Sequence, residues 1–326
     1  MKAIILGTGA TIGTIGAEAG VVGFVRRLAA VRSNWRAEYP LLAEAIDDCG
    51  GDANDVGLDQ IWTRLDYYSK FSKIFGTVYS GDVSTQLHKA ILDAYAFAED
   101  IGRICSAPSE YALKSVLAKL LPGETLISFN WDTLAETILC DVLGAKVVQV
   151  PHAASPERIR LAKPHGSLSW VHRNAEPILY RDETRLRLIA MSPAEVYSGM
   201  PGSCQPLILG ALPIKSELLD EVQTTEPGLH DLIVGQWTEV MDAISRCTEL
   251  IIVGYRFPPE DEYGRFLLRE AVKKRAAGLP LSLRYFSLAR DREVFERAFR
   301  DVFGSSVSYS YCGEVTTAFR PMGAAG

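Results

Sequence analysis

Short apolar runs of strand length alternate with amphipathic stretches along this chain. The runs lie at residues 3–6, 125–129, 146–150, 250–253 and 281–286. Such runs are typical of parallel strands that are covered on both faces. Because helical patterns separate most of them, the sequence predicts an α/β fold with a doubly wound, mostly parallel sheet.

A helical insertion is predicted after the first strand, because more than a hundred residues separate that strand from the next run of equal strand character. The insertion covers about residues 34–122. Its aromatic residues, such as Trp62 and Tyr95, are expected in its core. One apolar helix face is marked by residues that recur at steps of three and four, namely Leu87, Ile91, Ala94, Ala98, Ile101 and Cys105.

The second half of the chain continues the alternation. Thr133 and Glu136 have the spacing of a capping box, which predicts a helix that starts there and ends near Leu143. A further strand is possible at residues 207–209. The predicted elements that follow are a helix at 237–247, a strand at 250–253, a helix at 262–276, a strand at 281–286 and a helix at 291–303. The expectation is a single Rossmann-like domain over residues 1–315 and a flexible tail at 316–326.

Composition narrows the class of protein. Of the 326 residues, 48% are apolar and 23% charged, which allows a large core and excludes global disorder. The 34 basic and 40 acidic residues give a formal charge of −6, so general nucleic-acid binding is disfavoured. The six cysteines form no C-x-x-C pair, and neither a structural zinc site nor a disulfide framework is expected.

The N-terminal residues predict the location of the protein. Residues 1–7 run straight into a strand and a glycine turn rather than into a signal-peptide core and cleavage site. No apolar run approaches the roughly 20 residues that span a bilayer. A soluble, cytoplasmic protein without a membrane partner is therefore expected.

Candidate chemistry begins with the glycine turn Gly7-Thr8-Gly9-Ala10-Thr11 after the first strand. Glycines there let a phosphate approach the backbone, with amides at the following helix start as donors. The zone where a dehydrogenase carries an acidic ribose ligand holds Arg26, Arg27 and Arg32 instead, and the chain has no P-loop motif. Dehydrogenases and P-loop enzymes are disfavoured, while a nucleotide site and a plain turn both stay open.

Two further segments offer polar side chains. Asn130 and Asp132 follow the second strand, where strand ends face the ligand crevice of an α/β sheet. The plainer alternative makes Asp132 a helix cap and Asn130 a turn residue. His165 lies in the segment Lys163-Pro164-His165-Gly166-Ser167, between a proline and a glycine, and is therefore expected in a constrained loop. The residues and motifs that accompany His165, more than the histidine alone, make it a candidate.

The fourth segment, Val253-Gly254-Tyr255-Arg256-Phe257-Pro258-Pro259-Glu260-Asp261, leaves the strand at 250–253. Gly254 lets the backbone approach an adenosine or a ribose, and Tyr255 or Phe257 can supply an apolar wall. The two prolines that follow are expected to end the strand, and Asp261 is expected to cap the next helix.

In this order the four segments resemble the sirtuin-like superfamily, and most closely a bacterial branch with the pattern GAGAS, FNYD, K-x-HGS-x-x-W and IIGYSFP-x-x-D. The resemblance spans residue 5 to about residue 275. As in that branch, the four-cysteine zinc module of the protein-deacylating sirtuins is missing. Local departures are Thr8, Thr11, Trp131, Pro164 and Arg256, which stand where the branch usually has alanine, serine, tyrosine, leucine and serine.

The resemblance implies an NAD⁺ glycohydrolase that releases nicotinamide and ADP-ribose and depletes NAD⁺ in anti-phage defence, with NAD⁺ as substrate and no metal. Asn130 and His165 are the implied catalytic residues; Asn130 orients the ribose or the attacking water, and His165 accepts a proton. Asp132 is implied to hold the nicotinamide amide or to favour the developing positive charge. The implied NAD⁺-binding residues are Gly7, Thr8, Gly9, Ala10, Thr11, Phe129, Gly254, Tyr255 and Phe257.

The resemblance also implies a homo-oligomer and a separate activating chain, either a helicase-like ATPase or an argonaute-like protein, with no direct sequence-specific nucleic-acid binding. Two alternative functions stay open. An NAD-dependent protein deacylase is disfavoured because clustered cysteines are missing. A non-catalytic NAD or ADP-ribose sensor or assembly subunit is disfavoured because Asn130 and His165 are retained.

Overall fold

The computed structural model describes residues 1–15, 20, 23–50, 52–70, 81–95, 97, 102–104, 106, 112–149, 156–173, 176–179, 205–208, 227–259, 261–276, 278–287, 292–304 and 307–313. Several predicted features lie outside these residues. They are the helical positions Ala98, Ile101 and Cys105, the strand residues Val150 and Leu209, and the tail at 316–326.

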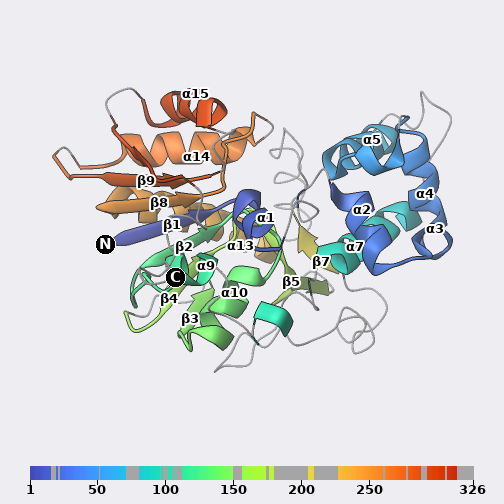
Figure 1. Ribbon diagram of the computed structural model, residues 1–326, viewed down its shortest axis with the longest axis horizontal. Helices are drawn as coiled ribbons and strands as arrows, with labels where there is room; N and C mark the ends of the chain where they lie inside the picture. The colour runs from blue at the N-terminus through green and yellow to red at the C-terminus, as the bar shows by residue number, and fades with distance from the viewer. Residues whose placement is uncertain are drawn as a thin grey trace, which may run out of the picture.

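A seven-stranded parallel sheet forms the centre of the molecule (Figure 1). Its order is β10 (Ser310–Tyr311), β9 (Ser282–Phe286), β8 (Glu249–Val253), β1 (Lys2–Leu6), β2 (Thr125–Ser128), β4 (Ile159–Ala162) and β3 (Val147–Gln149). All neighbouring strands pair in parallel. This sheet confirms the predicted α/β class with a doubly wound, mostly parallel sheet.

Both faces of the sheet are covered, because alternate residues of each apolar strand point to opposite sides. Ala3 and Ile5 pack with α13 (Pro227–Arg246), α14 (Glu262–Lys273) and α15 (Arg292–Phe303). Ile4 and Leu6 pack on the other side with α1 (Thr8–Ile15), α9 (Ala112–Leu117), α10 (Leu134–Thr137) and the π-helical turn η5 (Ile138–Val142).

A separate helical group lies between β1 and β2 in sequence and at one end of the molecule in space (Figure 1). It has its own apolar core, which includes Leu28, Leu42, Ile61 and Leu87. Leu28 belongs to α2, which precedes residue 34. The group comprises α2 (Phe24–Val31), α3 (Trp35–Glu38), α4 (Pro40–Asp47), η3 (Ala53–Asp55), α5 (Leu58–Lys70) and α7 (Gly81–Tyr95). In the part of the chain that the structure describes, no helix combines the length and the apolar character needed to cross a bilayer.

A second, antiparallel sheet adds to the predicted architecture. Its central strand β5 (Gly166–Arg173) pairs with β6 (Glu176–Leu179) and β7 (Gln205–Ile208). Of these strands only β7 was expected, near residues 207–209. The position of β5 matters for the site, because this strand begins directly after His165.

The predicted capping box at Thr133 and Glu136 is wrong. The Thr133 side chain caps no backbone amide. Instead Oδ1 of Asp132 accepts a hydrogen bond from the Leu134 amide at 3.0 Å. Glu136 turns inward to an ion pair with Lys163, whose ammonium stabilises a buried carboxylate more than a backbone amide would.

Candidate functional site

The carboxyl ends of three neighbouring strands form the centre of the candidate site. Leu6 is in register with Ser128 on one side and with Val253 on the other. The chain runs from β1 to β2 on one side, whereas β8 lies on the other, so this is the point where the strand order reverses. Ligands of open α/β sheets bind at such a point.

The glycines of the turn after β1 pack against the loop that leaves β8. The Gly9 amide donates to the Gly254 carbonyl at 3.0 Å, and the Ala10 amide donates to the Gly7 carbonyl at 2.8 Å. A Cβ on Gly9 would lie 2.7 Å from the Gly254 Cα, and one on Gly254, whose φ is +63°, only 2.3 Å from the Ala10 nitrogen. The observed need for glycine is thus contact between two loops. A phosphate-binding role for this turn stays a prediction.

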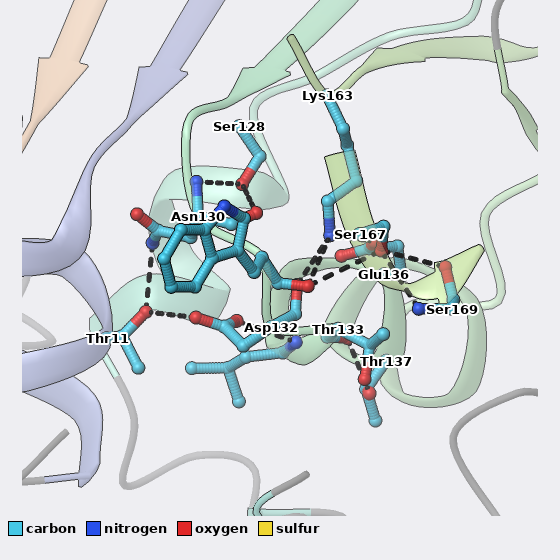
Figure 2. A network of polar contacts seen from close by, with 12 residues as sticks. Thr11, Ser128, Asn130, Asp132, Thr133, Glu136, Thr137, Lys163, Ser167 and Ser169 are labelled. Atoms are coloured by element: carbon cyan, nitrogen blue, oxygen red, sulfur yellow. Dashed lines mark hydrogen bonds and ion pairs between the residues drawn. The ribbon is translucent and has the colours of Figure 1, made fainter. Parts of the chain in front are cut away.

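Asn130 is held in a fixed orientation. Its Nδ2 donates to the Gly7 carbonyl at 3.0 Å and to Thr11 Oγ1 at 2.9 Å. Because the Gly7 carbonyl can only accept, the amide nitrogen must be the atom that faces it. Oδ1 of Asn130, turned away from Thr11 in Figure 2, is buried and has no hydrogen-bond partner. An oriented acceptor without a donor is uncommon in a protein interior, and a donor group of a ligand would satisfy it.

Asp132 belongs to the same hydrogen-bonded chain. Thr11 Oγ1 donates to Asp132 Oδ2 at 2.8 Å, and the Leu134 amide donates to Oδ1. Burial raises the pKa of the Asp132 carboxyl, while Lys163 and these two donors act in the opposite direction. Both carboxylate oxygens therefore have protein partners, and the bond from the Leu134 amide is the one that the helix-cap interpretation requires.

Lys163 is a buried cation that ties two loops together (Figure 2). Its Nζ donates to Glu136 Oε1 at 2.6 Å and to the Asp132 carbonyl at 2.5 Å. Burial raises the pKa of Glu136, and the charge of Lys163 opposes that shift. Lys163 thereby connects the end of β4 to the loop that carries Asn130. Lys163 is part of the third motif, but no role was expected for it from the sequence.

His165 lies in a second polar group. Its Nε2 is 3.0 Å from Asp261 Oδ1, and its ring meets the edge of Phe129 with centroids 5.0 Å apart. Tyr255 stacks on Phe129 at 4.3 Å and donates its hydroxyl to Asp261 Oδ2 at 2.5 Å. Burial, then the charge of Asp261, raise the pKa of Tyr255 well above its usual range, so its hydroxyl keeps its proton.

The structure brings most, but not all, of the predicted residues together. Phe129 connects the two polar groups, because Asn130 follows it in the chain and His165 packs on its ring. Phe257 is fully buried and packs on Phe295 and Phe303 of α15, with centroids 5.5 and 5.8 Å apart. It is a core residue in this arrangement.

Asp261 is a further candidate that the sequence pattern did not reveal, since it was expected only to cap a helix. Asp261 does cap α14, since its Oδ1 accepts from the Gly264 amide at 3.2 Å. Its second role depends on contact with His165, 96 residues away. The signal that points to it is its place in the fourth motif, a few residues beyond Tyr255.

The side chains present can bind a hydroxyl group and accept a proton. Asn130 supplies a fixed acceptor, and His165 supplies a titratable ring whose side chain is 16% exposed. Phe129 precedes Asn130 in the chain, and its buried ring contacts His165. Among the described residues, no cluster of three histidine, cysteine, aspartate or glutamate side chains has metal-binding geometry.

Six chains of solved structures are similar to this chain, including the two that follow, whereas no family model and no curated protein matches it. One of these structures comes from work on the structural basis for the mechanism and regulation of Sir2 enzymes. It is 12% identical to this chain, with a TM-score of 0.34, and the alignment covers 92% of both chains. The other is a Sir2 homologue with a histidine-to-asparagine substitution in complex with ADP-ribose, at 12% identity, a TM-score of 0.34 and 94% coverage of both chains. A TM-score this low carries no weight for function, which depends on the side chains described above.

Proposed function

We propose that the protein is an NAD⁺ glycohydrolase, which cleaves the bond between nicotinamide and ribose. The observation that carries this proposal is the Asn130 amide, which Gly7 and Thr11 orient so that its oxygen is an unpartnered, buried acceptor. Its natural complement is a hydroxyl donor, such as a hydroxyl of ribose or an attacking water. The motif resemblance supplies the choice of NAD⁺ among ribose-containing ligands.

The reaction needs few groups from the protein. The bond between ribose C1′ and the pyridinium nitrogen breaks with both electrons going to nicotinamide, which departs neutral and needs no general acid. The ribose gains oxocarbenium character, as in other glycoside hydrolyses. A water oxygen then bonds to C1′ and loses one proton. The products are nicotinamide, ADP-ribose and a proton.

Asn130 and His165 divide these tasks. The Asn130 oxygen binds a ribose hydroxyl or the water and fixes its direction, which lowers the entropic part of the barrier. His165 accepts the proton that the water or a ribose hydroxyl releases, since an imidazole titrates near neutral pH when unperturbed. The stacked rings of Phe129 and Tyr255 are buried, and Phe129 packs on His165, so they support the position of the imidazole.

The biological setting proposed here is NAD⁺ depletion in anti-phage defence, which is supported by the sequence motifs alone. The motif resemblance implies a protein that acts alone or together with a partner chain. An assay of the isolated protein must therefore cover a wide range of protein concentration, with and without neighbouring gene products.

The test is to incubate the protein with NAD⁺ and to quantify nicotinamide and ADP-ribose by mass spectrometry. His165→Gln and Asn130→Ala are each expected to lower kcat by roughly 10²- to 10⁴-fold, because each removes a group that acts on the reacting atoms. His88→Gln is the matched control, since His88 lies on α7 in the helical group and bonds the Ser84 carbonyl. Its activity should equal that of the wild type.

Full activity of both His165→Gln and Asn130→Ala would contradict the proposed mechanism. The same assay with an acylated lysine peptide separates hydrolysis from deacylation, because only deacylation produces 2′-O-acyl-ADP-ribose. Binding of NAD⁺ without turnover under every activating condition would identify a sensor instead.

A further inference from the structure

We propose that Asp261 is a positioning residue, whose carboxylate holds His165 in one tautomer and stabilises the imidazolium formed when His165 takes a proton. This inference rests on the proposed function for its catalytic consequence. It has a physical consequence of its own, which can be measured without any substrate.

The Asp261 carboxylate has hydrogen-bond partners in three separate parts of the structure. Oδ1 lies 3.0 Å from His165 Nε2 and accepts from the Gly264 amide at 3.2 Å. Oδ2 accepts from the Tyr255 hydroxyl at 2.5 Å. Asp261 is only 6% exposed, so these contacts fix both of its oxygens. A helix cap needs only one oxygen of the Asp261 side chain, and that side chain need not be buried. The contacts to Tyr255 and His165 are therefore not explained by capping.

The contact between Nε2 and the carboxylate determines where the protons of His165 reside. A carboxylate only accepts, so Nε2 carries the hydrogen and the lone pair of the neutral ring is on Nδ1. When Nδ1 takes a proton, the ring becomes positive 3.0 Å from Asp261. The carboxylate stabilises that charge without taking the proton itself, as in other histidine–carboxylate pairs.

The other charged groups near His165 that the structure describes have partners of their own. Lys163, two residues earlier, is paired with Glu136 and lies near Asp132, and Tyr255 stays neutral. Arg265 of α14 acts on Tyr255 and forms ion pairs with Glu262 and Asp301. Among the described contacts, Asp261 is the carboxylate that meets the imidazole directly.

Two substitutions at Asp261 separate positioning from capping. Asparagine caps helices as well as aspartate does, whereas glutamate caps poorly but keeps the charge. If Asp261 positions His165, Asp261→Asn lowers kcat by roughly 10²- to 10⁴-fold with KM changed little, and Asp261→Glu retains more activity than Asp261→Asn. If Asp261 is only a cap, the order of the two variants reverses.

The decisive measurement is an NMR titration of His165 in protein labelled with ¹³C-histidine, with no NAD⁺ present and the signal assigned by His165→Gln. Loss of a neighbouring negative charge disfavours imidazolium, so Asp261→Asn is expected to lower the His165 midpoint by about one pH unit. Asp52→Asn is the matched control, because Asp52 is an aspartate cap on η3, and it should leave the midpoint unchanged.

Equal midpoints in the wild type and Asp261→Asn would overturn the proposal, whether or not the protein hydrolyses NAD⁺. Conversely, a lowered midpoint in a protein without NAD⁺ hydrolysis would support the pairing of Asp261 with His165 and contradict the proposed function. Thermal unfolding of each variant checks that the fold is intact.

Discussion

Two polar clusters meet at the loop that begins with Phe129, and they differ in their access to water. The lysine cluster contains Lys163, Glu136, Asp132, Thr11 and Asn130. The side chains of its ion pair, Lys163 and Glu136, are 0% and 2% exposed. The histidine cluster contains His165, Asp261 and Tyr255, and its histidine side chain is 16% exposed.

This difference separates groups that hold a loop from groups that can do chemistry. A fully buried ion pair has no route for exchanging protons with solvent, and its charges are fixed by each other. The partly exposed imidazole can exchange protons with water. Two oxygens of the lysine cluster have no hydrogen-bond partner, Glu136 Oε2 and the Asn130 oxygen, and of the two only the Asn130 oxygen belongs to a neutral side chain. In the proposed mechanism the lysine cluster presents one amide acceptor, and the histidine cluster supplies the base.

The largest expected effect is the loss of stability on breaking the ion pair of the lysine cluster. Lys163→Met leaves the Glu136 carboxylate buried without its cation, and we expect a loss of about 3–5 kcal/mol in the free energy of unfolding. Urea denaturation measures it. The double variant Lys163→Met/Glu136→Leu removes both charges and should regain most of the loss. A single variant within about 0.5 kcal/mol of the wild type would show that the pair contributes nothing.

The pH dependence of the Lys163→Met variant is the second prediction. Burial raises the pKa of Glu136, and the variant lacks the ammonium that opposes this shift. Between the unfolded and the folded pKa, the folded state keeps a proton that the unfolded state has lost. Stability therefore falls as pH rises through this window, by up to about 1.4 kcal/mol per pH unit.

Urea denaturation at several pH values from acid to neutral tests this slope. The wild type should show a shallower fall, because Lys163 favours the ionised carboxylate. In the Lys163→Met/Glu136→Leu variant the extra slope should disappear. Parallel pH profiles of the wild type and Lys163→Met would mean that Glu136 reaches water when its partner is removed.

The strands were predicted from the sequence where burial alone decides the pattern. β1 and β8 are continuous apolar runs and were predicted within a residue or two. β4 was missed because Arg160 interrupts its apolar pattern. That arginine is tolerated in the central sheet because it forms an ion pair with Glu239 of α13. A partner 79 residues away leaves no periodic signal in the sequence.

In the candidate site, too, local sequence patterns could be predicted and contacts between distant residues could not. Asn130 and His165 could be singled out because each lies in a short motif at a strand end. The residues that orient these two side chains could not be predicted from the sequence. Glu136 has the local spacing of a capping box, yet its carboxylate binds Lys163, which is more distant in sequence. Local spacing predicts local hydrogen bonds, and a buried cation outweighs them.

The smallest expected effect comes from Tyr255→Phe, which removes one donor from the histidine cluster and keeps the ring stacked on Phe129. The lost hydrogen bond to the Asp261 carboxylate should lower the free energy of unfolding by about 1.5 kcal/mol. Because Asp261 keeps its contacts to Gly264 and His165, NAD⁺ hydrolysis should fall only a few-fold.

Tyr311→Phe is the matched control, since its hydroxyl donates to the neutral Ser287 carbonyl at 2.9 Å. It should lower stability by about 1 kcal/mol or less and leave activity unchanged. If Tyr255→Phe abolishes hydrolysis while the His165 titration midpoint stays that of the wild type, the hydroxyl itself acts on the substrate. The histidine cluster would then contain two groups that touch the reacting atoms, and its contrast with the lysine cluster would be sharper.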